Sequence, residues 1–286
     1  MEFVGDFILL LEFFFFLYLA KWAYDQVTDF SFKRELAEKD NLAFAITLIG
    51  YLAGVGIVLT GVVSGEEFLL DKQKLDPFEV FMTEMGYMAI YSILSIVLLL
   101  LSRIVNDRFI LHDFSVYKEV LEDKNSGTGV VLFASFVSTA MIISASISGE
   151  GLGIFSCIVF FIIGQVILIL FAKLYQYITP FCIHDEIEKD NVAVGCSFAG
   201  TLIAIGILVA KGITGEFDGF SELILHLVTY IMVGFILFPA IRVGFDKYFI
   251  HGVDLSKELV QDRNIGLGVL EGGLSIIVAT AIYFGI

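Results

Sequence analysis

The chain has 286 residues, of which 58% are hydrophobic and 17% charged, and its mean hydropathy is +0.89. This composition excludes a soluble globular domain and a disordered chain, and it is typical of a protein that crosses a membrane several times. The 17 basic and 32 acidic residues give a net charge of −15, which would repel phosphate groups. We therefore expect no nucleic-acid partner.

Eight stretches are apolar and long enough to span a bilayer, which needs about 20 residues of helix. They lie at residues 5–22, 42–63, 79–102, 127–147, 152–173, 192–213, 221–243 and 265–285. The first stretch carries acidic residues and no basic leader region, so we expect a retained membrane anchor rather than a cleavable signal. The sequence therefore predicts an all-α protein with eight transmembrane helices, whose immediate partner is the lipid bilayer.

The basic residues indicate how the chain is oriented, because loops rich in Lys and Arg stay on the cytoplasmic side. The connections after the first, third, fifth and seventh spans hold 14 of the 17 basic residues. We therefore expect these connections in the cytoplasm and both termini on the outer side. The outer face is acidic, either to concentrate cations there or because the same bias removed its Lys and Arg.

A fourfold repeat organises the sequence. The tetrad Glu38-Lys39-Asp40-Asn41 recurs at residues 188–191, and equivalent asparagines precede the fourth and eighth spans. The four repeated asparagines are Asn41, Asn125, Asn191 and Asn264. In the first three repeats a Ser/Thr-Gly-Glu signature follows 25 residues later, and its acids are Glu66, Glu150 and Glu216.

A second level of repetition divides the chain in half. Arg103 and His112 match Arg242 and His251 at a constant offset of 139. Residues 1–148 and 149–286 are therefore predicted to be two copies of one four-helix membrane domain. Each copy holds two helix pairs in the same orientation, so we expect a pseudo-twofold axis along the membrane normal. A pseudo-fourfold bundle is the more symmetric alternative.

The runs 41–45 with Gly50, and 191–195 with Ala199 and Gly200, resemble the signature of the YjfL-like inner-membrane family. That family is a four-helix bacterial domain of unknown function, and the resemblance covers both halves. It implies a bacterial inner membrane and a stress-related context, with no established reaction or substrate. The family pattern usually has Gly before the Asn, where this chain has Asp40, Lys124, Asp190 and Arg263.

The second, fourth, sixth and eighth spans are rich in small residues. Small residues let helix backbones approach closely, and close packing drives helix association in lipid. We therefore expect these four spans at the centre and the aromatic and Leu-rich spans facing lipid. The candidate packing residues are Gly50, Gly54, Gly200, Ala204, Gly268 and Gly272.

Both repeated motifs have two interpretations. Each asparagine precedes a span, where it can cap the helix, or the four amides can ring the cytoplasmic mouth of a central path. The Ser/Thr-Gly-Glu signature can end one helix and begin the next, or its acids can form an outer cation vestibule.

Ionisable groups inside the spans are the sharper functional clue, because a charge in hydrocarbon is costly unless it faces the bundle or water. The titratable candidates are Glu12, Glu84, His226 and Glu271. Leu132 stands at the repeat position of Glu271, so this acid breaks the symmetry. We consider proton or cation handling at these groups, with local structure or interfacial placement as the alternative.

Metal and enzyme chemistry have less support. His112, His184 and His251 would form a metal site if their loops converged, but their spacing matches no ligand signature. We therefore expect no metal and no cofactor. The three cysteines have no pairing pattern, and the chain has no nucleophile elbow, phosphate loop or zinc-protease helix. The sequence thus favours a protein that is not an enzyme.

The leading functional hypothesis is a channel or transporter-like protein for small cations or protons. The alternative is a non-transporting scaffold or envelope-stress component that binds a partner protein. A third question is self-association, because single four-helix domains would have to dimerise to form what this chain contains. We expect a monomer that mimics such a dimer, with a homo-oligomer as the alternative.

Overall fold

The computed structural model describes residues 2–28, 31–64, 76–148, 153–215, 219–244, 247 and 252–285. Within these residues, eight helices are long and apolar enough to cross a membrane. They are α1 (Glu2–Gln26), α2 (Leu42–Ser64), α4 (Pro77–Val105), α6 (Ser126–Ser148), α7 (Gly153–Ile178), α9 (Val192–Ile213), α10 (Phe220–Gly244) and α12 (Ile265–Tyr283). Each coincides with one predicted span, so the all-α membrane fold is confirmed.

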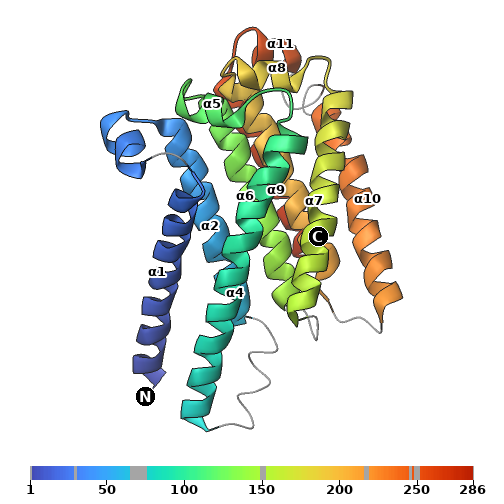
Figure 1. Cartoon of the computed structure of the whole chain (residues 1–286). Helices are drawn as coiled ribbons and strands as arrows, with labels where there is room; N and C mark the ends of the chain where they lie inside the picture. The colour runs from blue at the N-terminus through green and yellow to red at the C-terminus, as the bar shows by residue number, and fades with distance from the viewer. Residues whose placement is uncertain are drawn as a thin grey trace.

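The helices form two layers (Figure 1). An inner row runs α2, α6, α9, α12, and each of these helices packs along the next. An outer row of α1, α4, α7 and α10 packs against it. Three short helices, α5 (Val116–Leu121), α8 (Ile183–Glu188) and α11 (Leu255–Val260), gather at one end, which we call the short-helix end.

The inner row is open. α2 and α12 lie at its two ends and make no contact comparable to those between neighbours in the row. The pseudo-fourfold bundle is therefore not formed by the described part of the chain. The physical reason is that each middle helix uses different sides for its two neighbours, and these sides lie too far apart around the helix for α12 to pack on α2.

Glycine brings the inner helices together until their backbones touch. A Cβ atom at Gly50 would lie 2.5 Å from the Cα atom of Phe133, and one at Gly200 would overlap the backbone of Gly272. Such contacts maximise van der Waals packing where lipid removes the hydrophobic drive for association. In α6 and α9, 78% and 83% of the span residues are buried. Two of the four small-residue spans therefore occupy the core, whereas the α2 and α12 spans, at 56% and 28% buried, form the ends of the inner row.

The other candidate packing residues lie in the same interfaces. A Cβ atom at Gly268 would overlap the carbonyl of Ala193, and one at Gly54 would lie 3.3 Å from the carbonyl oxygen of Phe136. Ala204 is fully buried. The α6–α9 interface adds a hydrogen bond from Ser138 to the Leu202 carbonyl at 2.8 Å. Each interface in the row is therefore close-packed.

Each inner helix begins at its repeated asparagine. The side-chain oxygens of Asn41 and Asn125 accept hydrogen bonds from the third backbone N–H beyond them, at 3.0 and 2.9 Å. Asn191 and Asn264 do the same at 3.3 and 3.2 Å. These bonds satisfy N–H groups that have no partner within the helix. The asparagines are thus helix N-caps.

The residue before each asparagine has a positive φ between 48° and 55°. These residues are Asp40, Lys124, Asp190 and Arg263. Left-handed backbone favours glycine, because any side chain there crowds the following carbonyl. This geometry explains why a family pattern would carry Gly at that position.

Candidate functional site: a buried polar network

The strongest polar feature inside the helices is an ion pair between Arg242 of α10 and Glu271 of α12. Nη1 of Arg242 lies 2.8 Å from Oε1 of Glu271. Arg242 is 9% exposed and Glu271 is 3% exposed, so the protein itself supplies the environment of both charges. An isolated charge at this place would cost several kcal/mol, and pairing offsets that cost.

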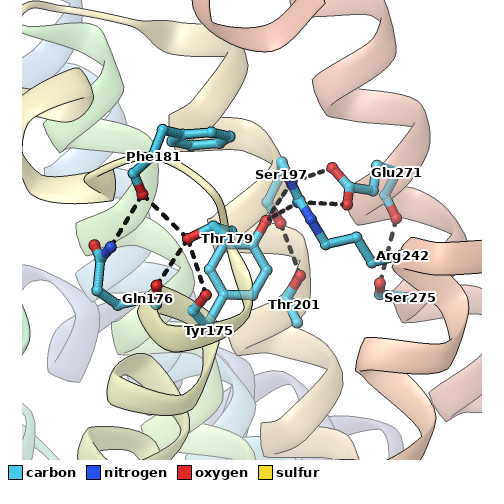
Figure 2. A network of polar contacts seen from close by, with 9 residues as sticks. All are labelled: Tyr175, Gln176, Thr179, Phe181, Ser197, Thr201, Arg242, Glu271 and Ser275. Atoms are coloured by element: carbon cyan, nitrogen blue, oxygen red, sulfur yellow. Dashed lines mark hydrogen bonds and ion pairs between the residues drawn. The ribbon is translucent and has the colours of Figure 1, made fainter. Parts of the chain in front are cut away.

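Two hydroxyl groups complete the network (Figure 2). Ser197 of α9 donates to Oε2 of Glu271, and its hydroxyl lies 2.6 Å from that of Tyr175 of α7. Nη1 of Arg242 also donates to the Tyr175 hydroxyl, at 3.1 Å. Since Ser197 donates its proton to the carboxylate, Tyr175 donates to Ser197. The hydrogen bonds therefore form a closed circuit through four helices.

Aromatic rings and a helix terminus hold the guanidinium in place. The guanidinium carbon of Arg242 lies 5.6 Å from the ring centre of Tyr175 and 5.7 Å from that of Phe181. Phe181 is positioned by its carbonyl, which accepts a hydrogen bond from Gln176 at 3.0 Å. Thr179 bonds back to the Tyr175 carbonyl at 3.1 Å. Cation–π contact therefore adds to the ion pair.

The first half of the chain lacks this pair. Arg103, the counterpart of Arg242, lies over the ring of Tyr24 at 5.5 Å. The position of Glu271 is taken by the buried Leu132. Asn106 and Ser135 form a separate hydrogen bond there. The polar network thus belongs to the second half alone, and it ties α7, α9, α10 and α12 together.

A cavity of about 660 Å³ lies between the inner helices at the end opposite the short-helix end. All four inner helices contribute to its lining, together with Phe13 of α1. Its described wall is mainly apolar, and the residues in it that carry a hydroxyl group are Thr60, Ser144, Thr214, Thr280 and Tyr283. None of the intramembrane acids that the sequence singled out lies in this described lining.

The structure separates the titratable candidates. Glu271 is paired with Arg242, which agrees with the alternative of a local structural role. Oε2 of Glu12 is buried without a hydrogen-bond partner among the described residues. His226 lies 3.2 Å from the Gly212 carbonyl and against the ring of Tyr230. Glu84 lies on α4, so the four candidates come from four different helices: α1, α4, α10 and α12.

The asparagines do not ring a central path, because the inner row is open. Instead, three of them link one repeat to the next. Nδ2 of Asn41 donates to the Val120 carbonyl at 2.8 Å, and Nδ2 of Asn125 donates to the Ile187 carbonyl at 2.6 Å. Nδ2 of Asn191 donates to the Leu259 carbonyl at 2.8 Å.

Each asparagine also binds an acid of its own repeat's short turn or helix. Nδ2 of Asn125 donates to Glu119 at 2.7 Å, and Asn41, Asn191 and Asn264 make the equivalent bonds. Burial raises the pKa of the Glu119 carboxyl, and the hydrogen bond from Asn125 partly opposes that rise. In the first three repeats, the capping asparagine, the acid of the same repeat and a carbonyl of the next repeat thus form one recurring unit.

The outer acids of the Ser/Thr-Gly-Glu signature lie outside the described residues. These acids are Glu66, Glu150 and Glu216. His251 lies outside them as well.

The structure brings His112 and His184 together with Asp113. One potential ligand atom from each residue lies within 4.8 Å of the other two. The sequence placed the two histidines 72 positions apart with no ligand spacing, and it gave no reason to include Asp113. Only the approach of α8 to the loop after α4 reveals the cluster.

Sequence reasoning also missed most of the buried network. Arg242 was identified only as the repeat partner of Arg103, while Tyr175 and Ser197 were not singled out. A signal was present, since Arg242 ends one span and Glu271 lies near the start of the next. Both therefore had to lie at similar depth near the short-helix end.

Eight membrane-spanning helices in two repeated halves define a polytopic membrane protein with a tandem domain. The chain belongs to the family described as Domain of Unknown Function (DUF350), whose model matches residues 3–147 and again residues 150–286. The comparisons support this family and its tandem arrangement, and they do not support the name YjfL-like.

The chain is also similar to a UPF0719 transmembrane protein of Aquifex aeolicus (strain VF5). The two are 22% identical over 252 residues, which cover 82% of this chain and 87% of that protein. No solved structure matches the chain.

Proposed function

We propose that this protein is a non-transporting membrane scaffold that acts through contacts with partner proteins. The observation that carries the proposal is the packing of the inner row, where glycines bring the backbones of neighbouring helices into direct contact. The buried network supports it, because the charges of Arg242 and Glu271 neutralise each other and their hydroxyl partners close the circuit. Such a network holds helices together, and the proposal includes no catalytic role.

A second candidate function is cation or proton transport. The cavity of about 660 Å³ favours it, because all four inner helices line it and its described lining includes five residues that carry a hydroxyl group. The unpartnered Oε2 of Glu12 also fits a proton-binding group. The apolar wall and the absence of acids from its described lining weigh against it.

A flux measurement separates these two functions. Protein in liposomes is expected to pass protons, Na⁺ and K⁺ no faster than matched protein-free liposomes. A cation or proton flux that Glu12→Gln or Glu84→Gln reduces would overturn the scaffold proposal. Arg108→Ala, which changes an exposed charge, serves as the control for purification and insertion.

We also propose a bacterial inner-membrane location with the short-helix end in the cytoplasm and both termini outside. The support is the concentration of basic residues in the connections at that end. Protease added to sealed, right-side-out vesicles is then expected to leave α5, α8 and α11 intact. Cleavage within them would reverse the proposed orientation.

A further inference from the structure

The three interfaces of the inner row repeat one geometry. In α6, α9 and α12, the glycine four positions after the capping asparagine approaches a backbone carbonyl of the previous inner helix. That carbonyl belongs to the residue two positions after the previous helix's own capping asparagine. A Cβ atom at Gly129 would lie 2.7 Å from the Ala43 oxygen, and one at Gly195 would lie 2.9 Å from the Gly127 oxygen. Gly268 approaches the Ala193 carbonyl in the same way. Each helix therefore has one side for its predecessor and another for its successor.

The two ends of the row carry the unused halves of this interface. On α12, Gly266 and Gly273 occupy the successor-side positions, and a Cβ atom at Gly273 would have no neighbour within 4 Å. On α2, Ala45 and Ile49 occupy the predecessor-side positions, and Ile49 is 54% exposed. In the α2–α6 interface, Gly50 is the equivalent of Gly273, and it packs on Phe133, the equivalent of Ile49.

The asparagine links end in the same way. Three asparagines donate to a carbonyl in the next repeat, whereas Nδ2 of Asn264 reaches only Glu258 of its own repeat among the described residues. Val120 and Leu259 lie five positions before their own asparagines, and Ile187 lies four positions before Asn191. The residue at that position in the first repeat is Leu36, five before Asn41. A second copy would present Leu36 to Asn264.

Each helix of the outer row after α1 lies over the boundary between two successive helices of the inner row. α4, α7 and α10 each contact two successive inner helices and pack more extensively on the earlier one. Among the described residues, no inner helix precedes α1 and no outer helix follows α12. The α12 span, at the end of the inner row, is 28% buried, against 83% in α9. α1 of a second copy would cover α12 as α4 covers α2.

We propose that copies of this chain associate head to tail, with α12 of one copy packed on α2 of the next and α1 of the next copy lying over α12. This deepens the proposed function, because the partner of the scaffold is then a second copy. The contact joins unlike surfaces in parallel orientation, so it generates a ring or a continuous row of copies. It continues the interface already present three times within the chain.

Disulfide trapping tests this assembly in native membranes. In a full-length background with Cys157, Cys182 and Cys196 replaced by serine, Ile49→Cys and Gly273→Cys are combined in one chain. Oxidation is expected to give a ladder of dimers and larger species. Mixing the two single-cysteine chains is expected to give one heterodimer band, because the contact joins unlike surfaces. Pairing Ile49→Cys with Ile236→Cys, on the exposed face of α10, should give none.

A second measurement separates assembly from folding. Gly273→Trp is expected to reduce the assembled fraction in lipid nanodiscs at least twofold. The melting temperature should not change, because a Cβ atom at position 273 has no neighbour within 4 Å. Gly86→Trp, also in open space, should change neither. Monomers at membrane concentrations, or traps joining Gly273→Cys to itself, would overturn the assembly. If neither the ladder nor ion flux is seen, the assembly is overturned and the scaffold must act on other partners. If both are seen, the assembly stands and the scaffold function is overturned.

A second inference rests on the cluster of His112, Asp113 and His184. Nε2 of His184 lies 2.7 Å from the Ile110 carbonyl, and a carbonyl can only accept, so Nε2 carries a proton. In neutral His184 the lone pair on Nδ1 then faces Oδ2 of Asp113 at 3.5 Å. Two acceptors face each other there, which favours a cation between them. A histidine held by a carbonyl through its other nitrogen is typical of metal ligands.

We infer that these three side chains bind a divalent transition metal such as Zn²⁺, leaving a fourth position for water or another ligand. The metal would join the loop after α4 to α8, which lie in different halves of the chain. His184 is the least exposed of the three at 13%, whereas His112 is 44% exposed, so the site is open to solvent.

Zn²⁺ titration of the full protein in detergent tests this site. We expect binding of one Zn²⁺ per chain and a rise in melting temperature, both lost in His184→Ala and Asp113→Asn. His226→Gln, a histidine at the other end of the bundle, should retain both. No difference in Zn²⁺ binding between wild type and His184→Ala would overturn the proposal.

Discussion

Replacing Arg242 with methionine is expected to lower the free energy of unfolding by about 3–5 kcal/mol, because it leaves Glu271 buried without its ionic partner. Glu271→Leu alone should cost a similar amount, since the guanidinium then loses the carboxylate. Equilibrium unfolding in detergent micelles measures both. The exposed charge of Arg108 provides the control, and Arg108→Ala should change stability by less than about 0.5 kcal/mol.

The double variant Arg242→Met with Glu271→Leu distinguishes pairing from simple loss of volume. It is expected to recover most of the stability, because an apolar pair of similar size avoids the desolvation cost of two charges. Leu132 already fills the equivalent place in the first half of the chain. A double variant as unstable as the sum of the single variants would show that the network stabilises through more than this pair.

Gly200→Val is expected to have the second large effect. Its side chain would overlap the backbone of Gly272, and a backbone cannot move aside as a flexible side chain can. Overpacking typically costs about 1–3 kcal/mol and sometimes more, and we expect the upper end or beyond. The same unfolding measurement reports the change, together with loss of the native melting transition.

Gly86→Val is the matched control for this substitution. Gly86 lies inside α4, and a Cβ atom there would have no neighbour within 4 Å. The intrinsic helix preference changes equally in both variants, so their difference isolates the contact between α9 and α12. Equal stability of the two variants would mean that these helices do not pack backbone to backbone.

Most of the fold could be predicted because its signals are local. A run of about 20 apolar residues forms a helix in lipid whatever surrounds it, so the eight spans follow from composition. Glycine-rich faces at Gly50 and Gly200 predicted which spans pack closely, since only a missing side chain allows such approach. The helix starts at Asn41 and Asn191 likewise follow from the short-range geometry of a cap.

The polar site could be predicted only in part. Glu271 stood out because an acid is rare in a span, and repeat alignment showed Leu132 in its place. Its pairing with Arg242 depends on how α10 and α12 are rotated about their axes, which is decided by packing against α9. The convergence of Asp113 and His184 depends in the same way on where α8 meets the loop after α4.

The sequence by itself determined the class of this protein, its eight helices, its repeats and the residues that let helices touch, because each depends on neighbours along the chain. Only the tertiary structure decided that the inner helices form an open row and that α2 and α12 carry complementary free edges. Closure of a bundle depends on the angle between successive contacts, to which all four repeats contribute. No single repeat carries a sequence signature of that angle, although each repeat carries the glycines that make the contacts.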